Sequence, residues 1–235
     1  MVLHGSGSDA AFVRSAFEVP LARQGLRLLA PEDRTGDPLA MAHRLGQLVR
    51  SRADITIVGG VSVGAHAVAR WAAHDRSAAQ IAGLLLVMPA WTGTRAAAAE
   101  LTAHSAKALR RNGVHTELLR LGLDPEVARD WVMEELSRAW PQQVASLPDS
   151  LLQTAQSRGP LLSELSRIRI ATGVVALDDD PLHPASVAEE WAARLRFARL
   201  TRVARHAPAT DRSVFGAAAI NALLRAQPLQ GAHSA

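Results

Sequence analysis

The 235-residue sequence has no cysteine, no tyrosine and a single lysine, Lys107. The absence of cysteine excludes disulfide bonds and thiolate catalysis, and it fits a cytoplasmic protein. No apolar run approaches 18 residues, so no membrane-spanning helix is expected. The N-terminus has neither the basic region nor the apolar region of a signal peptide. We therefore expect a cytoplasmic protein that does not associate with a membrane.

The basic residues are almost all arginine. Lys and Arg together number 26 against 22 Asp and Glu, which gives a net charge of only +4 at pH 7. These residues are scattered along the chain, and no aromatic platform for stacking RNA bases accompanies them, so no nucleic-acid partner is expected. The nine histidines form no H-E-x-x-H motif and have no cysteine to support them. Neither a metal site nor a cofactor is therefore expected.

Residues 54–68 are the most informative segment of the chain. A β-branched run at residues 54–58 predicts a buried strand, and the small residues from position 65 onward predict a helix. Between them lies Gly-Val-Ser-Val-Gly, the G-x-S-x-G pattern of a nucleophile elbow in its strand–turn–helix context. Such a turn requires residues without bulk two positions before and two after the serine, here Gly60 and Gly64. Ser62 is thus a candidate nucleophile; the alternative is an ordinary serine in a glycine-rich turn.

Two further segments occur in an order that matches this motif. An apolar strand end runs into His-Gly at residues 2–7, and a second apolar strand runs into Asp-Asp-Asp-Pro-Leu-His-Pro at residues 178–184. After a further helix and strand comes His206. The chain order Ser, Asp, His is that of α/β-hydrolases. The sequence resembles this superfamily over essentially its whole length.

The resemblance implies roles for five residues. Ser62 would be the nucleophile, His206 the general base, and Asp180 the acid that orients the base. The backbone N–H groups of Ser6 and Val63 would form the oxyanion hole, and the helix after the serine would direct its positive end toward the same place.

The acid and the base both have rivals. Asp180 best matches the Asp-Pro-x-x-Pro loop of the family; its rivals are Asp179, the stronger one, and Asp178. His183 competes with His206, but it lies in the same loop as the acid, and we expect the base to reach across from a separate loop. The family usually has glycine immediately before the histidine, where this sequence has Arg205.

Alternating strands and helices predict an α/β fold with a mostly parallel sheet. We expect about six strands in the spatial order 2-1-3-4-5-6, with residues 26–30 forming an edge strand and the first two strands of the family absent. The core would comprise residues 1–90 and 168–235. Residues 91–167, where the alternation stops, would form a helical cap. The exposed edge would be open to a second copy of the chain, as in a homodimer.

Four large side chains of the cap region are candidates for lining a substrate pocket: Trp91, Trp131, Met133 and Trp140. The same side chains could equally attach the cap helices to the core. His4, in contrast, is expected to support the oxyanion loop and to take no part in the chemistry.

These features predict a cofactor-free serine hydrolase that cleaves an apolar ester, lactone or thioester through an acyl-enzyme. A serine at the elbow argues against epoxide hydrolases and haloalkane dehalogenases, which use a carboxylate there. Two other functions fit the same residues. The triad could act as a base in an elimination or cyclisation, or the protein could be a small-molecule sensor on a hydrolase scaffold. A covalent adduct on Ser62 would favour hydrolysis over both.

Overall fold

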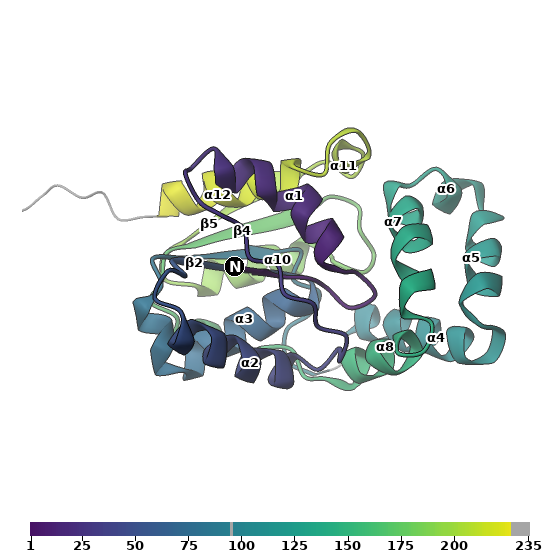
Figure 1. Cartoon of the computed structure of the whole chain (residues 1–235), viewed down its shortest axis with the longest axis horizontal. Helices are drawn as coiled ribbons and strands as arrows, with labels where there is room; N and C mark the ends of the chain where they lie inside the picture. The colour runs from purple at the N-terminus through teal and green to yellow at the C-terminus, as the bar shows by residue number, and fades with distance from the viewer. Residues whose placement is uncertain (95, 227–235) are drawn as a thin grey trace, which may run out of the picture.

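The computed structural model describes residues 1–94 and 96–226. Its centre is a parallel sheet of five strands that lie side by side in chain order. The strands are β1 (Val2–Leu3), β2 (Ile57–Val61), β3 (Gly83–Val87), β4 (Thr172–Leu177) and β5 (Ala198–Val203). The central strands are continuously apolar, because both faces of the sheet are covered by helices (Figure 1).

Five helices form the layers on the two faces of the sheet. Helices α1 (Ala10–Ala22) and α12 (Val214–Ala226) cover one face (Figure 1). The other face carries α2 (Pro38–Ser51), α3 (Val63–His74) and α10 (Ala185–Arg194). Each face has its own cluster of buried apolar side chains, so the sheet separates two cores.

The edge of the sheet differs from the predicted topology. Residues 26–30 run beside β1 but form no strand; one backbone hydrogen bond, from Val2 N–H to the Leu29 carbonyl at 2.9 Å, joins them. The predicted order 2-1-3-4-5-6 is therefore wrong at this end, and β1 is the edge strand. The reason is the length of β1: a strand of two residues offers too few groups on its outer side for a regular ladder.

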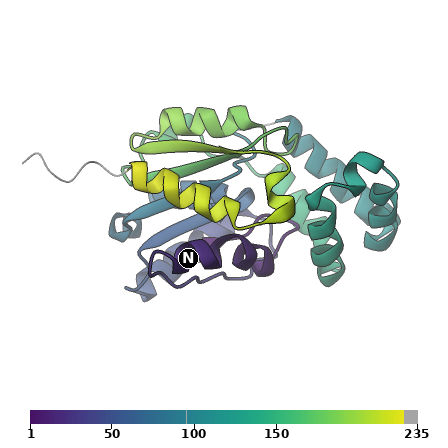
Figure 2. The same ribbon diagram turned by 90° about the horizontal axis from the view of Figure 1, so that it is seen from above.

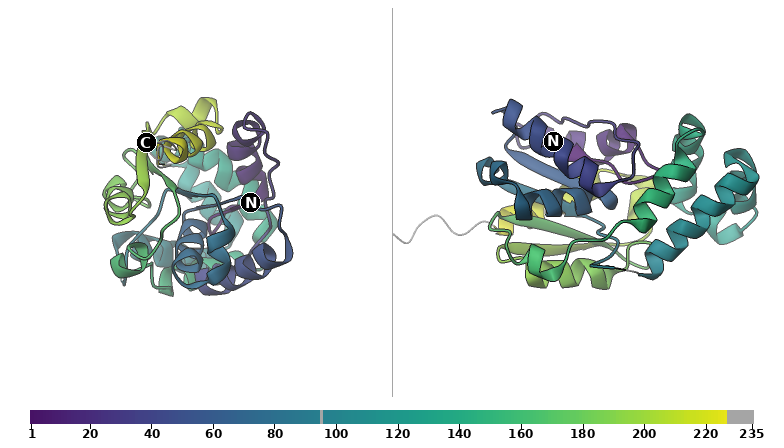
Figure 3. Two further views of the ribbon diagram at one scale, coloured as in Figure 1. Left: turned by 90° about the vertical axis from the view of Figure 1, so that its left-hand side faces the viewer. Right: turned by 90° about the horizontal axis from the view of Figure 1, so that it is seen from below.

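Between β3 and β4 the described chain is helical. The elements are α4 (Ala97–Asn112), α5 (Val114–Gly122), α6 (Pro125–Ala128), α7 (Trp131–Ala139), a 3₁₀ turn η2 (Trp140–Gln143), α8 (Leu147–Gln156) and α9 (Leu162–Leu165). Figure 2 shows α4 to α8 beyond one end of the sheet, and the view from below in Figure 3 shows these helices in the same position. Of the helices described, none has the length and apolarity needed to span a membrane.

Candidate active site

The turn between β2 and α3 has the geometry of a nucleophile elbow. Ser62 has φ of 55° and ψ of −119°, a backbone conformation that residues other than glycine rarely adopt. A Cβ atom on Gly60 would lie 2.2 Å from the Gly64 carbonyl carbon, and one on Gly64 would lie 2.7 Å from the carbonyl oxygens of Leu3 and His4. Both glycines are therefore required for the close approach of helix and strands at the turn, as the motif predicts.

Ser62, His183 and Asp180 form a chain of hydrogen bonds. The Ser62 Oγ lies 2.9 Å from Nε2 of His183, and Nδ1 of that ring lies 2.9 Å from Oδ2 of Asp180. The other carboxylate oxygen of Asp180 accepts the backbone N–H groups of Leu182 at 2.9 Å and His183 at 3.3 Å. These bonds turn the loop after β4 back on itself. One short segment thus supplies both the carboxylate and the imidazole.

His206, the predicted base, is not part of this chain. It lies at the start of α11 (Ala207–Thr210) with its side chain exposed, and the structure gives it no hydrogen bond to Ser62 or Asp180. The expectation that the base must come from a separate loop is wrong for this geometry, because the turn that Asp180 organises brings His183 within reach of the serine. The signal in the sequence was an aspartate three residues before a histidine. In this spacing the backbone N–H groups of Leu182 and His183 can donate to the carboxylate of Asp180.

The protonation states follow from the surroundings of Asp180. Its burial acts to raise the pKa, but the His183 imidazole and its hydrogen bond, together with the Arg205 guanidinium, hold the pKa well below its ordinary value. The ionised carboxylate can only accept, so Nδ1 of His183 carries the proton and donates it to Asp180. Nε2 is then free to accept the hydroxyl proton of Ser62, the tautomer that a general base requires.

The two rival aspartates lie outside this arrangement. Asp179 is exposed at a positive φ of 53° in the turn after β4. Asp178 pairs with Arg202 of β5 at 2.7 Å. The geometry thus brings Asp180, and neither of its neighbours, to the imidazole.

The loop that contains the predicted oxyanion donor Ser6 lies beside Ser62. A Cβ on Gly5 would lie 3.0 Å from the Cβ of Ser62, so the loop after β1 touches the nucleophile. The N–H groups of Ser6 and Val63 have no acceptor among the described residues. For Val63 the reason is its place in the first turn of α3, where backbone N–H groups have no partner within the helix.

Two buried histidines support the site through backbone groups. Nε2 of His4 accepts the N–H of Asp33 at 2.9 Å, so its Nδ1 carries the proton and donates to the Gly5 carbonyl at 2.8 Å. His4 therefore holds the oxyanion loop, which agrees with the expectation for this residue. Burial lowers the pKa of His66 to about 3, and its Nε2 accepts the N–H of Ala90 at 3.2 Å. This second bond fixes the loop after β3.

Trp131 attaches the cap region to the core. Its buried ring stacks on Phe12 at a centroid distance of 6.2 Å and lies 5.7 Å from the ring of Phe215. Its indole N–H donates to the backbone carbonyl of Arg205 at 3.1 Å. Of the two interpretations of this residue, these contacts favour attachment.

The other three candidates for a substrate pocket are in different surroundings. Trp91 is buried edge-on against the ring of His66 at 4.8 Å. Trp140 is buried in the apolar cluster between α4 and α8. Met133 is half-buried and lines a cavity of about 360 Å³ that Ala209 also borders. A role in substrate binding stays a prediction for all three.

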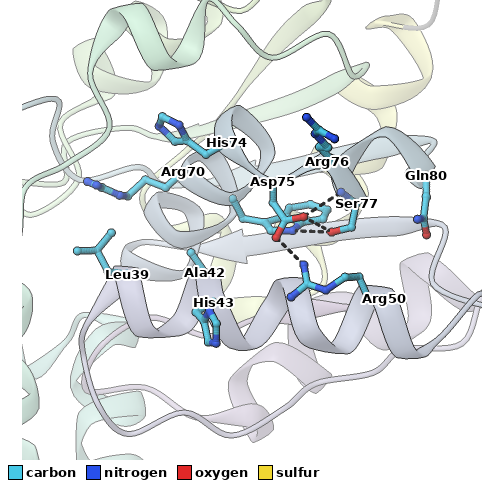
Figure 4. A pocket seen from close by; sticks show the side chains of 11 residues that line it. Leu39, Ala42, His43, Arg50, Arg70, His74, Asp75, Arg76, Ser77 and Gln80 are labelled. Atoms are coloured by element: carbon cyan, nitrogen blue, oxygen red, sulfur yellow. Dashed lines mark hydrogen bonds and ion pairs between the residues drawn. The ribbon is translucent and has the colours of Figure 1, made fainter.

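A larger groove lies away from these residues. It has a volume of about 810 Å³ and lies between α2, α3 and the 3₁₀ turn η1 (Arg76–Gln80), as Figure 4 shows. Arg50 on its wall pairs with Asp75 at 2.7 Å, and His74 pairs with Glu164 at 2.8 Å. The groove contains no member of the Ser–His–Asp chain, and it is not part of the candidate active site.

No protein-family model matches the sequence, and no curated protein matches it. Solved structures do match. A bromoperoxidase from Bacillus anthracis has a TM-score of 0.73 and 14% identity, over 95% of this chain and 91% of that chain. A thermophilic esterase from Thermogutta terrifontis has a TM-score of 0.71 and 18% identity, over 95% and 88%. An enol-lactonase from Burkholderia xenovorans LB400 has a TM-score of 0.63 and 16% identity, over 86% and 82%.

The chain has the α/β-hydrolase fold, which confirms the fold predicted from its sequence. At these identities the likeness establishes the fold alone. Because one fold supports many reactions, the function has to be argued from the residues of the site.

Proposed function

We propose that the protein is a serine hydrolase that cleaves an ester-type bond of an apolar acyl compound. Ser62 is the nucleophile, His183 the general base, and Asp180 the carboxylate that fixes the tautomer of His183. The observation that carries the proposal is the continuous Ser62–His183–Asp180 hydrogen-bonded chain at a serine with positive φ. Strained backbone of this kind persists where the surrounding structure enforces it, which is typical of catalytic turns.

In the first half-reaction, Nε2 of His183 takes the proton of the Ser62 hydroxyl while Oγ forms a bond to the substrate carbonyl carbon. The carbonyl electron pair moves onto the oxygen, and the N–H groups of Ser6 and Val63 bind the resulting oxyanion. The bond to the leaving group then breaks, and the leaving group takes the proton from Nε2 of His183. An acyl ester of Ser62 remains.

In the second half-reaction a water molecule gives a proton to Nε2 of His183 and adds to the acyl carbon. The tetrahedral intermediate collapses, Oγ leaves, and Ser62 recovers its proton from the imidazolium. Asp180 stays ionised throughout and stabilises the positive ring. This cycle needs no cofactor.

The substrate class follows from this chemistry. Carboxylic esters, lactones and thioesters all offer an activated carbonyl carbon and a leaving group that accepts one proton. Two of the matched structures are named as an esterase and an enol-lactonase, and both names agree with an oxygen ester. That the acyl group is apolar stays a prediction from the sequence.

The test is covalent labelling with a fluorophosphonate, followed by mass spectrometry of the protein and by hydrolysis assays with p-nitrophenyl butyrate. We expect one adduct, on Ser62, and its complete loss in Ser62→Ala. Ser166→Ala is the matched control, because that exposed hydroxyl bonds only a nearby carbonyl and should label like the unsubstituted protein. Hydrolysis that survives in Ser62→Ala would contradict the proposal, as would turnover without an adduct.

A further inference from the structure

Arg205 joins the candidate active site to the helix α7. Its Nη1 lies 3.1 Å from Oδ2 of Asp180, the same oxygen that accepts Nδ1–H of His183. Its Nε and Nη2 lie 2.8 Å and 2.6 Å from a carboxylate oxygen of Asp130, the residue that caps α7. Its backbone carbonyl accepts the indole N–H of Trp131. One side chain therefore contacts the catalytic carboxylate and the cap at once.

The contact between Arg205 and Asp180 is one of charge. Nη1 is buried and makes no hydrogen bond of normal geometry within the described residues. The carboxylate already accepts three N–H groups, two from the backbone of its own loop and one from His183. Its orientation is thus fixed without Arg205. What the guanidinium adds is a positive charge beside the carboxylate on which the imidazole depends.

We propose that Arg205 is a positioning residue whose positive charge favours the unprotonated His183 ring that a general base requires; this inference rests on the proposed function. An ionised carboxylate alone favours the protonated ring, which cannot act as a base. Because the guanidinium and the imidazole contact the same oxygen, their nitrogens lie within about 6 Å, where the positive guanidinium opposes a second positive charge on the ring.

The other ionisable groups near His183 do not supply this charge. On α3, His66 is uncharged because burial lowers its pKa to about 3. On α7, Asp130 is negative and offsets part of the guanidinium charge. In the loop of His183 itself, Asp178 is paired with an arginine of β5, and Asp179 is exposed to solvent.

The cap has anchors that do not involve Arg205. Arg138 of α7 binds both carboxylate oxygens of Asp9, at 2.7 Å and 2.9 Å. Arg212 lies over the Trp131 ring at 5.0 Å and pairs with Glu134 of α7 at 2.7 Å. Loss of the Arg205 charge should therefore leave α7 docked. Arg212 is also a matched control, since it holds the same helix and the structure gives it no contact with Asp180.

The experiment measures the rate of fluorophosphonate labelling of Ser62 as a function of pH, from about pH 5 to about pH 9. The rate rises as His183 loses its proton, and the midpoint reports the pKa of the base. Arg205→Gln should move the midpoint about one unit to higher pH. Arg205→Lys, which keeps a charge, should recover at least half of the shift, and Arg212→Gln should keep the original midpoint. Arg205→Met, which has no charge, repeats the test if the glutamine variant does not fold.

An unchanged midpoint in Arg205→Gln and Arg205→Met, with labelling intact, would overturn the inference and leave the proposed function standing. Equal shifts in Arg205→Gln and Arg212→Gln would also overturn it, because they would trace the effect to loosening of the cap. Failure of Ser62 to label at any pH in the unsubstituted protein is a different result: it would overturn the proposed function and this inference together.

Discussion

Replacing His183 by alanine should lower kcat/KM for p-nitrophenyl butyrate by about 10³-fold or more, which corresponds to about 4 kcal/mol of activation free energy. The magnitude follows from the geometry. His183 is the group 2.9 Å from Ser62 Oγ that can take its proton, and Asp180 is 2.9 Å from the other ring nitrogen. Removing the imidazole leaves the serine without a base and the buried carboxylate without its partner.

The matched control is His206→Ala. That histidine occupies the position at which the family places its base, but its side chain is exposed and away from the chain of hydrogen bonds. We expect His206→Ala to retain kcat/KM within about threefold, because surface substitutions of this kind alter little. The double variant Ser62→Ala/His183→Ala should be hardly slower than either single variant, since members of a triad act as a unit.

The assays are initial rates of ester hydrolysis and the rate of fluorophosphonate labelling, each with a thermal melt to show that the variant is folded. The reasoning would be refuted if His206→Ala lost activity by 10³-fold while His183→Ala stayed active. Such a result would mean that the loop carrying Arg205 and His206 rearranges to present His206 to Ser62. Equal and large losses in both variants would mean that two histidines act in separate steps.

Two further predictions concern stability. His66 has a folded-state pKa of about 3 against its ordinary 6.5, so the unfolded chain binds the extra proton first and stability falls as the pH drops through this window. Between pH 6 and 4, His66→Gln should therefore reduce the slope of unfolding free energy against pH by about 1 kcal/mol per unit, measured by urea titration; parallel profiles would contradict a neutral buried ring. Trp131→Ala should destabilise the protein by about 3 to 5 kcal/mol through lost packing on Phe12 and Phe215, and it should affect small and bulky esters alike; a selective rise of KM for bulky esters would instead assign Trp131 to the substrate.

The elbow could be predicted from the sequence because its requirements are local. Within five residues the chain must end a strand, place Ser62 at positive φ and begin a helix, and each step restricts the residue type. A Cβ at Gly60 or Gly64 would overlap backbone atoms that lie less than 3 Å away. The same holds for the fold class, since alternating buried strands and amphipathic helices leave few arrangements other than a parallel sheet.

The candidate base, His183, could not be predicted from its position in the α/β-hydrolase pattern. That pattern assumes that the acid and the base come from different loops, and it took no account of the turn that Asp180 forms. Once a carboxylate accepts the N–H groups two and three residues ahead, the side chain at the third residue folds back beside it. Whether His183 of the local turn or His206 of the later loop reaches Ser62 depends on the surrounding residues as well as on the turn. Arg205 of the later loop lies 3.1 Å from Oδ2 of Asp180, whereas His206 of the same loop is exposed.

The edge of the sheet shows how little regular structure this site requires. Strand β1 pairs with β2 through two residues, Val2 with Gly59 and Leu3 with Gly60, and residues 26–30 add one hydrogen bond on its other side. The loop that follows is nevertheless fixed by side chains: His4 binds the Gly5 carbonyl, and at its far end Arg138 of α7 binds Asp9. Because α7 also binds Arg205 through Asp130, one helix contacts both the loop after β1 and the arginine that lies beside Asp180.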